Sequence, residues 1–171
     1  MLNEPYMQKK MTNSNWSVAD ICDQFPGNYS VLPQIFQHYG NIKKCWGEIE
    51  TILLEEDNNL LIELLSKEGG GRVVFVQCQN KEAAVFGDRL AKIALDHHWA
   101  GVIIDGAIRD ISTLSKMPVC VLASAKNPVR GKQNGGGEIG VIINVDQATI
   151  RPNEIIYADE DGIITTSKEF F

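Results

Sequence analysis

Apolar residues in this chain follow two patterns, one spaced as on a helix face and one packed into short continuous runs. The leucines of residues 60–65 recur at helical spacing. Residues 72–77 and 100–105 are almost uninterrupted apolar runs, as in strands that are buried on both faces. The pattern therefore predicts an α/β protein in which buried strands alternate with helices.

Turn-forming residues divide the chain into elements. The predicted helices are residues 17–25, 33–39, 60–68 and 88–98, with a short helix or turn at 107–116. The predicted strands are residues 46–54, 72–77, 100–105 and 118–123, followed by β-like segments at 140–145, 147–159 and 162–167. Three glycines at 69–71 end the third helix, and Gly106 is expected to turn the chain after the strand 100–105. The C-terminal part is therefore expected to be rich in β structure.

The length of 171 residues suggests one domain. We assign residues 14–171 to it and expect the polar residues 1–13 to form a flexible tail, with Met11 as an alternative start. The N-terminus has no apolar segment long enough for a signal peptide, and no run approaches the ~20 apolar residues of a membrane span.

Charge and cysteine usage narrow the class of protein further. A formal net charge of −6 argues against direct nucleic-acid binding, because there is no excess of cations to neutralise phosphates. The four cysteines are widely spaced and show no zinc pattern, so we expect buried, reduced thiols in a cytoplasmic protein.

One candidate site begins at Gly87-Asp88, where a loop leads into a predicted helix. A glycine lets a ligand approach the backbone, and the free amides of a first helical turn favour an anion. The same residues would also suit a simple helix cap by Asp88.

A second candidate is Arg109-Asp110, which follows the predicted strand 100–105. Ligands of α/β proteins often lie beyond the carboxyl ends of strands. Arginine can hold a carboxylate with two hydrogen bonds, and aspartate is a hard oxygen ligand for a divalent metal. A salt-bridged surface turn would explain the pair equally well.

Other polar residues favour structural explanations. Lys126, Arg130 and Lys132 lie in a glycine-rich loop that could bind an anion, but a solvated loop is the simpler interpretation. Asp105-Gly106 is expected to be a turn, and the adjacent His97 and His98 should point to different sides of a helix.

The segments VADICDQF, GDRLAKIA, WAGVIIDGAIRD and YADEDGII resemble the RraA-like family, over residues 18–166. That family includes the regulator of ribonuclease activity A and the class II 4-hydroxy-4-methyl-2-oxoglutarate aldolases. Twenty residues separate Asp88 from Arg109-Asp110, which is similar to the Asp-x20-Arg-Asp pattern of the aldolases. The resemblance implies a swivelling β/β/α-type core with short N-terminal helices and a β-rich C-terminal part, assembled as a homotrimer.

The resemblance also implies a role for each matching residue. Asp110 would bind the metal, Mg²⁺ or Mn²⁺, and Arg109 would hold the pyruvyl end of a small 2-oxo acid and stabilise its enolate. Asp88 would orient a metal-bound water for proton transfer. The amides of the four residues that open the helix would bind the substrate carboxylate; these residues are Gly87, Asp88, Arg89 and Leu90. The implied enzyme is a lyase, an aldolase that also decarboxylates oxaloacetate.

Two points leave this interpretation open. The alternative function is a regulator that binds and inhibits ribonuclease E without chemistry of its own. In addition, many relatives have a glycine-rich turn where this chain has residues 77–80, Gln-Cys-Gln-Asn, and these bulkier side chains are expected either to narrow the site or to move its wall.

Overall fold

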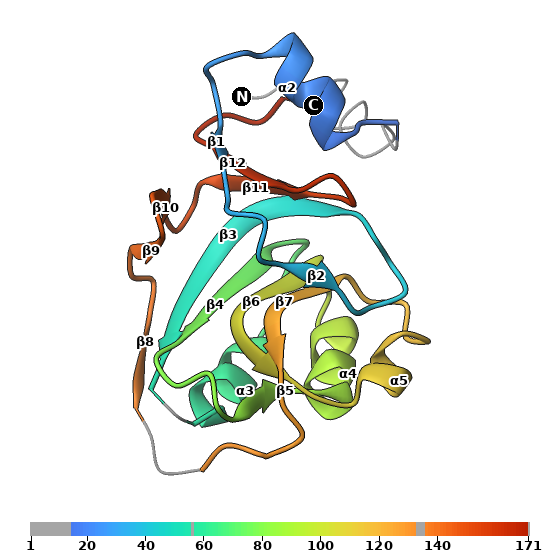
Figure 1. Ribbon diagram of the computed structural model, residues 1–171, viewed down its shortest axis with the longest axis vertical. Helices are drawn as coiled ribbons and strands as arrows, with labels where there is room; N and C mark the ends of the chain where they lie inside the picture. Colours follow the sequence, from blue (N-terminus) through green and yellow to red (C-terminus); the bar gives the residue numbers. More distant parts are fainter. Residues whose placement is uncertain (1–14, 56, 133–135, 171) are drawn as a thin grey trace.

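The computed structural model describes residues 15–55, 57–132 and 136–170, which build a ten-stranded sheet with helices at both ends of the molecule (Figure 1). The strands on the main path are, in spatial order, β1 (Ser30–Val31), β12 (Ile163–Thr166), β11 (Ile155–Ala158), β3 (Cys45–Leu54), β4 (Val73–Cys78), β6 (Gly101–Ile108), β7 (Val121–Lys126) and β2 (Gln37–His38). Beside this path, β5 (Ala84–Phe86) pairs with β6, and β8 (Gly137–Ile139) pairs with β3. A separate hairpin consists of β9 (Ile143–Val145) and β10 (Ala148–Ile150).

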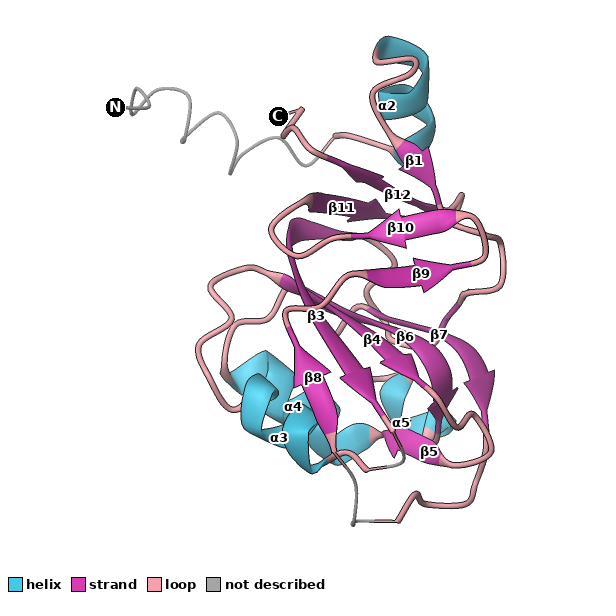
Figure 2. Ribbon diagram, turned by 90° about the vertical axis from the view of Figure 1, so that its left-hand side faces the viewer, coloured by secondary structure: helices cyan, strands magenta, loops and turns pink. Residues whose placement is uncertain are grey.

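The long strand β3 joins two parts of the sheet. Its beginning pairs antiparallel with β11, with Cys45 opposite Ala158. From Ile49 onward it pairs parallel with β4. The strands β3, β4, β6 and β7 thus form a parallel core, and β11, β12 and β1 extend it as an antiparallel ribbon (Figure 2).

The two faces of the parallel core are covered differently. The helices α3 (Asn59–Leu65), α4 (Asp88–Asp96) and α5 (Ile111–Leu114) cover one face, and the β9–β10 hairpin covers the other. Side chains of β4 alternate accordingly, so that Val74 and Val76 pack toward the helices while Phe75 packs toward the hairpin. Burial on both faces explains why this strand is a continuous apolar run.

The helix α2 (Val18–Gln24) lies at the other end of the molecule, against the antiparallel ribbon (Figure 1). Ser17 caps it, because its Oγ accepts a hydrogen bond from the Asp20 backbone N–H at 3.0 Å. Ile21 then packs with Tyr157 and Ile164 of the ribbon. The predicted α/β class and the helix at 17–25 are confirmed.

The predicted helix at 33–39 is wrong. Its segment makes a turn and then the edge strand β2, in which His38 lies opposite Leu122 of β7. Phe36, just before this strand, packs edge-to-face on Phe75 at a ring distance of 5.9 Å. Pairing and packing with the sheet outweigh the weak helical pattern, and α2 is the one N-terminal helix among the described residues.

The predicted turn at Gly106 is also wrong. Strand β6 continues to Ile108, flanked by β5 and β7, and its pairing with β7 shifts register between Ile104 and Ala107. Asp105 is therefore a buried strand residue that accepts hydrogen bonds from Lys81 Nζ at 2.6 Å and Ser124 Oγ at 3.0 Å. Where a turn was expected, Asp105 instead accepts hydrogen bonds from neighbouring side chains within the sheet.

Other boundaries shift by a few residues: the strand predicted at 118–123 is β7, Val121–Lys126, and the β-like segment 147–159 is divided between β10 and β11. Helix α4 ends at Asp96 rather than at residue 98, and His98 takes a positive φ of 59°. His97 is half-buried and His98 is exposed, as expected. The predicted tail, residues 1–13, and Met11 lie outside the described residues.

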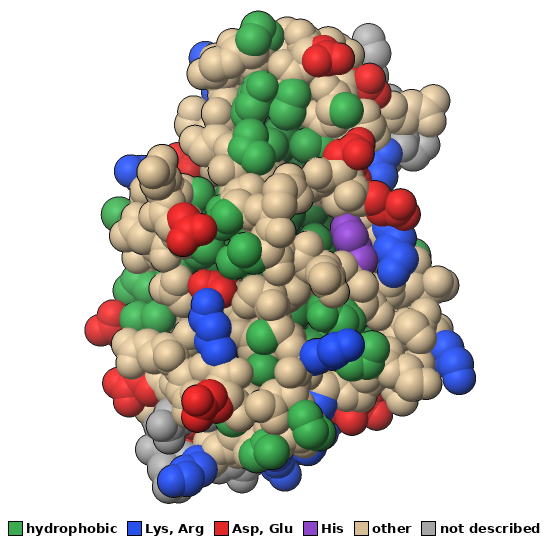
Figure 3. Space-filling model, viewed as in Figure 1, with side chains coloured by type: hydrophobic (Ala, Val, Ile, Leu, Met, Phe, Trp, Pro, Cys, Tyr) green, Lys and Arg blue, Asp and Glu red, His purple; other side chains and the backbone are tan. Residues whose placement is uncertain are grey.

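The cysteines are mostly buried, and the visible surface carries charged side chains of both signs. All four cysteines are free, and Cys45, Cys78 and Cys120 are buried while Cys22 is half-buried. On the face shown in Figure 3, acidic and basic side chains are interspersed among patches of hydrophobic ones. Within the described residues, no helix has the length and apolar character needed to cross a bilayer.

Candidate active site

The two candidate motifs meet because their strands are neighbours. Strand β5 runs parallel to β6, and Phe86 lies opposite Ile108. Each strand ends there, so Gly87-Asp88 and Arg109-Asp110 leave the sheet at the same edge. The Arg109 N–H donates to the Phe86 carbonyl at 3.0 Å and fixes the two exits side by side. Ligands commonly bind at such carboxyl ends of parallel strands.

Asp110 is held against the start of helix α4. Its backbone is left-handed, with φ 62° and ψ 36°, a conformation that aspartate tolerates better than most residues. Its Oδ2 accepts a hydrogen bond from the Asp88 N–H at 3.2 Å. One carboxylate oxygen thereby takes one of the free amides of the helix, while the side chain remains exposed on its other side.

Gly87 makes this arrangement possible. A Cβ atom at this position would lie 2.3 Å from Asp110 Oδ2, closer than any stable contact. The φ of Gly87 is −163°, which is extended backbone open to any residue. A side chain at this position would therefore displace the Asp110 carboxylate, although the backbone conformation itself would admit any residue.

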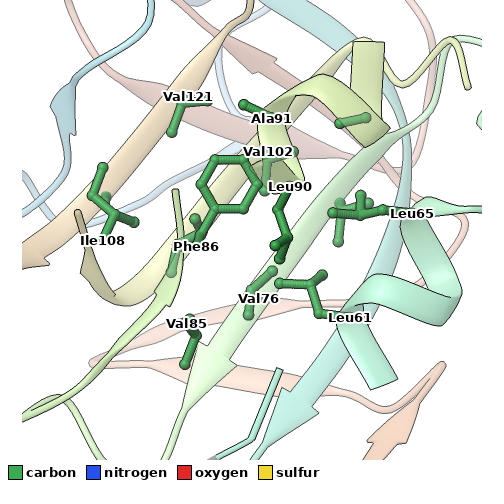
Figure 4. Close-up of a cluster of buried hydrophobic side chains, with 14 of the residues drawn as sticks. Leu61, Leu65, Val76, Val85, Phe86, Leu90, Ala91, Val102, Ile108 and Val121 are labelled. Atoms are coloured by element: carbon green, nitrogen blue, oxygen red, sulfur yellow. The ribbon is translucent and has the colours of Figure 1, made fainter. Parts of the chain in front are cut away.

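The helix that carries the amides is anchored in the core. Phe86 and Leu90 point into a buried cluster with Val76, Leu61 and Val102 (Figure 4). Leu90 can therefore contribute only its backbone N–H to a ligand. Among the described residues, no hydrogen-bond acceptor is assigned to the N–H groups of Arg89 and Leu90, whereas Ala91 N–H closes the first helical turn on Gly87.

Two adjoining cavities open at this edge, and Arg109 and Asp110 line both of them. The smaller one, about 240 Å³, is lined by Asn58, Ala84, Val85, Phe86, Gly87, Asp88, Arg89, Leu90, Arg109, Asp110 and Arg130. The larger one, about 490 Å³, is lined by Ile108, Arg109, Asp110, Ile111, Lys126, Asn127 and Pro128. We call the smaller one the amide cavity, because the helix N-terminus forms part of its wall.

The structure brings all six predicted site residues together in the wall of the amide cavity. Residues 77–80, by contrast, line neither cavity. Gln77 instead donates through Nε2 to the Asn144 carbonyl at 2.8 Å, beneath the β9–β10 hairpin. These four residues therefore neither narrow the two cavities nor form part of their walls.

The wall of the amide cavity also contains residues that the motifs do not indicate. Arg130, which the sequence places in a loop expected to be solvated, lines this cavity. Asn58 and Ala84, which no motif indicated, line it as well, and Asn58 Nδ2 donates to the Val85 carbonyl at 3.1 Å. In the sequence, the one feature that points to Arg130 is the spacing of basic residues among the glycines of its loop.

The residues present suit a weakly held divalent ion. No three His, Cys, Asp or Glu side chains within residues 15–55, 57–132 and 136–170 are placed to hold a metal ion together. Mg²⁺ and Mn²⁺ accept hard oxygen ligands, and Mg²⁺ usually keeps several waters and takes one or two carboxylates. Asp110, exposed to solvent and fixed by Asp88 N–H, fits such an ion as a single protein ligand.

The fold and the site thus define an α/β protein with an Asp–Arg pair and open helix amides at one sheet edge. Its family follows from comparison with known proteins. Residues 18–165 match the family model described as RraA-like, Aldolase/RraA, and the chain belongs to this family.

Similar proteins carry three different names. A protein of Laribacter hongkongensis, provisionally named a 4-hydroxy-4-methyl-2-oxoglutarate aldolase, is 38% identical over 86% of this chain and 94% of its own length. The RNA-processing inhibitor RraA from Thermus thermophilis is 32% identical with a TM-score of 0.85, covering 90% of this chain and 93% of that one. A Geobacillus kaustophilus structure named as a 2-dimethylmenaquinone methyltransferase is 36% identical with a TM-score of 0.85, covering 91% and 97%. One fold therefore carries several named functions, and the choice among them depends on the site.

Proposed function

We propose that this protein is a divalent-metal-dependent 4-hydroxy-4-methyl-2-oxoglutarate aldolase that also decarboxylates oxaloacetate. The observation that carries the proposal is the Asp110 carboxylate seated over Gly87, beside Arg109 and two open helix amides. The exposed Asp110 carboxylate lies in the wall of the same cavity as Arg109 and the helix N-terminus, as a metal-assisted cleavage of a 2-oxo acid requires. The names of the similar aldolases support the same reaction.

The residues divide the work of breaking a carbon–carbon bond. The N–H groups of Arg89 and Leu90 hold the substrate carboxylate at the helix N-terminus. Arg109 stabilises the negative charge that develops as the C3–C4 bond breaks and a pyruvate enolate forms. Asp88, exposed at the mouth of the cavity, orients a water that takes the proton of the C4 hydroxyl as C4 becomes the carbonyl carbon of one pyruvate, and that returns a proton to the enolate carbon to complete the second pyruvate.

The metal completes this division of work. Asp110 would hold a Mg²⁺ or Mn²⁺ ion, which when bound supplies Lewis-acid polarisation of the 2-oxo group. Oxaloacetate should react as well, because loss of its distal carboxylate as CO₂ leaves the same enolate.

The test is pyruvate release from 4-hydroxy-4-methyl-2-oxoglutarate, followed by NADH oxidation with lactate dehydrogenase. We expect turnover with Mg²⁺ that stops with a chelator, and an Arg109→Met variant at least about 100-fold slower. Arg151→Met, an exposed arginine outside both cavities, is the matched control and should keep full activity. Equal rates for both variants would contradict the proposed role of Arg109.

We further propose that the protein is a cytoplasmic homotrimer. Free thiols suit a reducing compartment. Several large apolar side chains are exposed on the single chain, including Val129, Ile139 and Ile142, and their burial would favour self-association. Light scattering after gel filtration should give three times the mass of one chain, and a monomer at micromolar concentration would contradict the assembly.

A second candidate function is the regulation of a ribonuclease. The 32% identity to a protein named as an RNA-processing inhibitor favours it. We expect any binding to a ribonuclease E fragment to survive the Arg109→Met substitution, because masking needs no chemistry. Failure of an immobilised fragment to retain the protein at moderate salt would exclude this function.

A further inference from the structure

Arg130 is tied to the strand that leads into the site. The Ala84 N–H donates to the Val129 carbonyl at 2.8 Å, and the Gly131 N–H donates to the Ala84 carbonyl at 3.2 Å. These bonds form an isolated parallel bridge between Ala84 and Arg130. Ala84 starts strand β5, which ends one residue before Gly87. The backbone of Arg130 is thus fixed to the same strand that positions the helix amides.

The side chain of Arg130 is available to a ligand. It is exposed, and it lines the amide cavity together with Arg109 and the start of helix α4. Within the described part of the chain, no acidic group forms an ion pair with it. A guanidinium without a carboxylate partner can give two parallel hydrogen bonds to a carboxylate that enters the cavity.

The charges of the cavity favour a substrate with more than one carboxylate. Its wall carries three arginines, Arg89, Arg109 and Arg130, and two carboxylates, Asp88 and Asp110, which gives a formal charge of 3 − 2 = +1. A divalent ion raises this to +3. A monocarboxylate would leave a charge of +2 there, whereas a dicarboxylate leaves +1. Electrostatic complementarity therefore selects the more highly charged oxo acid.

We propose that Arg130 binds the distal carboxylate of the aldol substrate, a group that the cleavage retains, and makes the aldol cleavage selective for dicarboxylic 2-oxo acids. The 2-oxo end lies against the amides and Arg109, and the opposite end reaches the guanidinium of Arg130. This inference rests on the proposed function and adds a specificity-determining residue to it. Lys126, which lines the neighbouring cavity, is the rival cation for the same carboxylate.

The experiment compares two substrates that differ in the distal group. 4-Hydroxy-4-methyl-2-oxoglutarate carries a carboxylate at C4, and 4-hydroxy-2-oxopentanoate carries a hydrogen in its place. Both release pyruvate, so one assay serves for both. For Arg130→Met we expect kcat/KM to fall about 10- to 100-fold with the dicarboxylate and less than about threefold with the monocarboxylate. Arg130→Lys should recover part of the loss, and Arg151→Met should change neither rate.

Two outcomes would overturn the assignment. Equal losses with both substrates would show that Arg130 acts on structure or on the reacting end. A dicarboxylate-selective loss in Lys126→Met but not in Arg130→Met would assign the role to the neighbouring cavity.

A binding measurement separates this inference from the proposed reaction. Calorimetry with Mg²⁺ present compares 2-oxoglutarate with 2-oxobutyrate, neither of which can undergo the cleavage. We expect tighter binding of 2-oxoglutarate, reduced about 10-fold or more in Arg130→Met. If no substrate turns over but this preference persists, the proposed reaction fails and the anion site stands. If turnover occurs without the preference, the role of Arg130 fails alone.

Discussion

Gly87 lies directly against the Asp110 carboxylate, and a Gly87→Ala substitution should therefore strongly reduce activity without unfolding the protein. The new Cβ would lie 2.3 Å from Asp110 Oδ2 and 3.3 Å from its Cγ, while real Cβ atoms essentially never approach within 3.0 Å. The φ of −163° accepts alanine without strain. The clash is therefore confined to the Asp110 carboxylate and does not involve the backbone.

The geometry sets the size of the effect. The carboxylate oxygen must move by at least 3.0 − 2.3 = 0.7 Å from a position in which it accepts a 3.2 Å hydrogen bond from Asp88 N–H. Because the side chain is exposed, the move should cost about 1 kcal/mol of folding stability or less. A displacement near 1 Å in a catalytic group can lower a rate about 100-fold. We therefore expect kcat/KM to fall by that order and the apparent affinity for Mg²⁺ to weaken.

The assay is Mg²⁺-dependent pyruvate release by Gly87→Ala, with urea unfolding measured on the same preparation. Gly136→Ala is the matched control, since its Cβ would meet nothing closer than 3.9 Å and the residue lies outside both cavities. In an Asp110→Ala background the Gly87→Ala substitution should have little further effect, because the clashing oxygen is gone. Full activity of Gly87→Ala with unchanged Mg²⁺ affinity would refute the reasoning.

Two further predictions concern the body of the fold. Burial raises the pKa of the Cys78 thiol to about 12, whereas hydrogen bonding with Cys45 and His38 lowers the pKa of Cys120 to about 6. Because Cys45, Cys78 and Cys120 are all buried, a thiol reagent at pH 8 should nevertheless label the native chain rapidly at Cys22 alone, and all four cysteines after unfolding. Rapid labelling that persists in Cys22→Ser would show that another thiol is accessible. Asp105→Ala should lower the free energy of unfolding by about 2 kcal/mol, because Lys81, Gln77 and Ser124 lose their acceptor, and a loss below ~0.5 kcal/mol in urea melts would contradict that network.

Local patterns predicted the elements that local physics determines. The apolar run of β4 and the leucine spacing of α3 matched the structure, and so did the Ser17 cap of α2. The failures came from long-range pairing. The segment 33–39 is an edge strand because β7 offers it partners, and Gly106 stays in a strand because β5 and β7 flank it.

In the candidate site, too, local motifs were predictable and long-range contacts were not. Spacing and family resemblance identified Gly87-Asp88 and Arg109-Asp110, and the structure places them together. The approach of Arg130 was not predictable from its loop, because it depends on backbone bonds to Ala84, 46 positions earlier in the chain. The role of Gly87 could be stated physically only once the position of the Asp110 oxygen was known.

The most direct test of the central claim is oxaloacetate decarboxylation by the parent protein and by Asp110→Asn. Asparagine keeps the shape of aspartate and an oxygen that can accept from Asp88 N–H, so the fold should be retained while the charge that holds the metal is lost. Pyruvate formation is measured with Mg²⁺, with chelator and with Mg²⁺ restored, after subtraction of the reaction without protein. The account predicts Mg²⁺-dependent turnover by the parent and a loss of at least about 100-fold in the variant. Equal rates for both proteins, or a parent rate that the chelator does not lower, would contradict it.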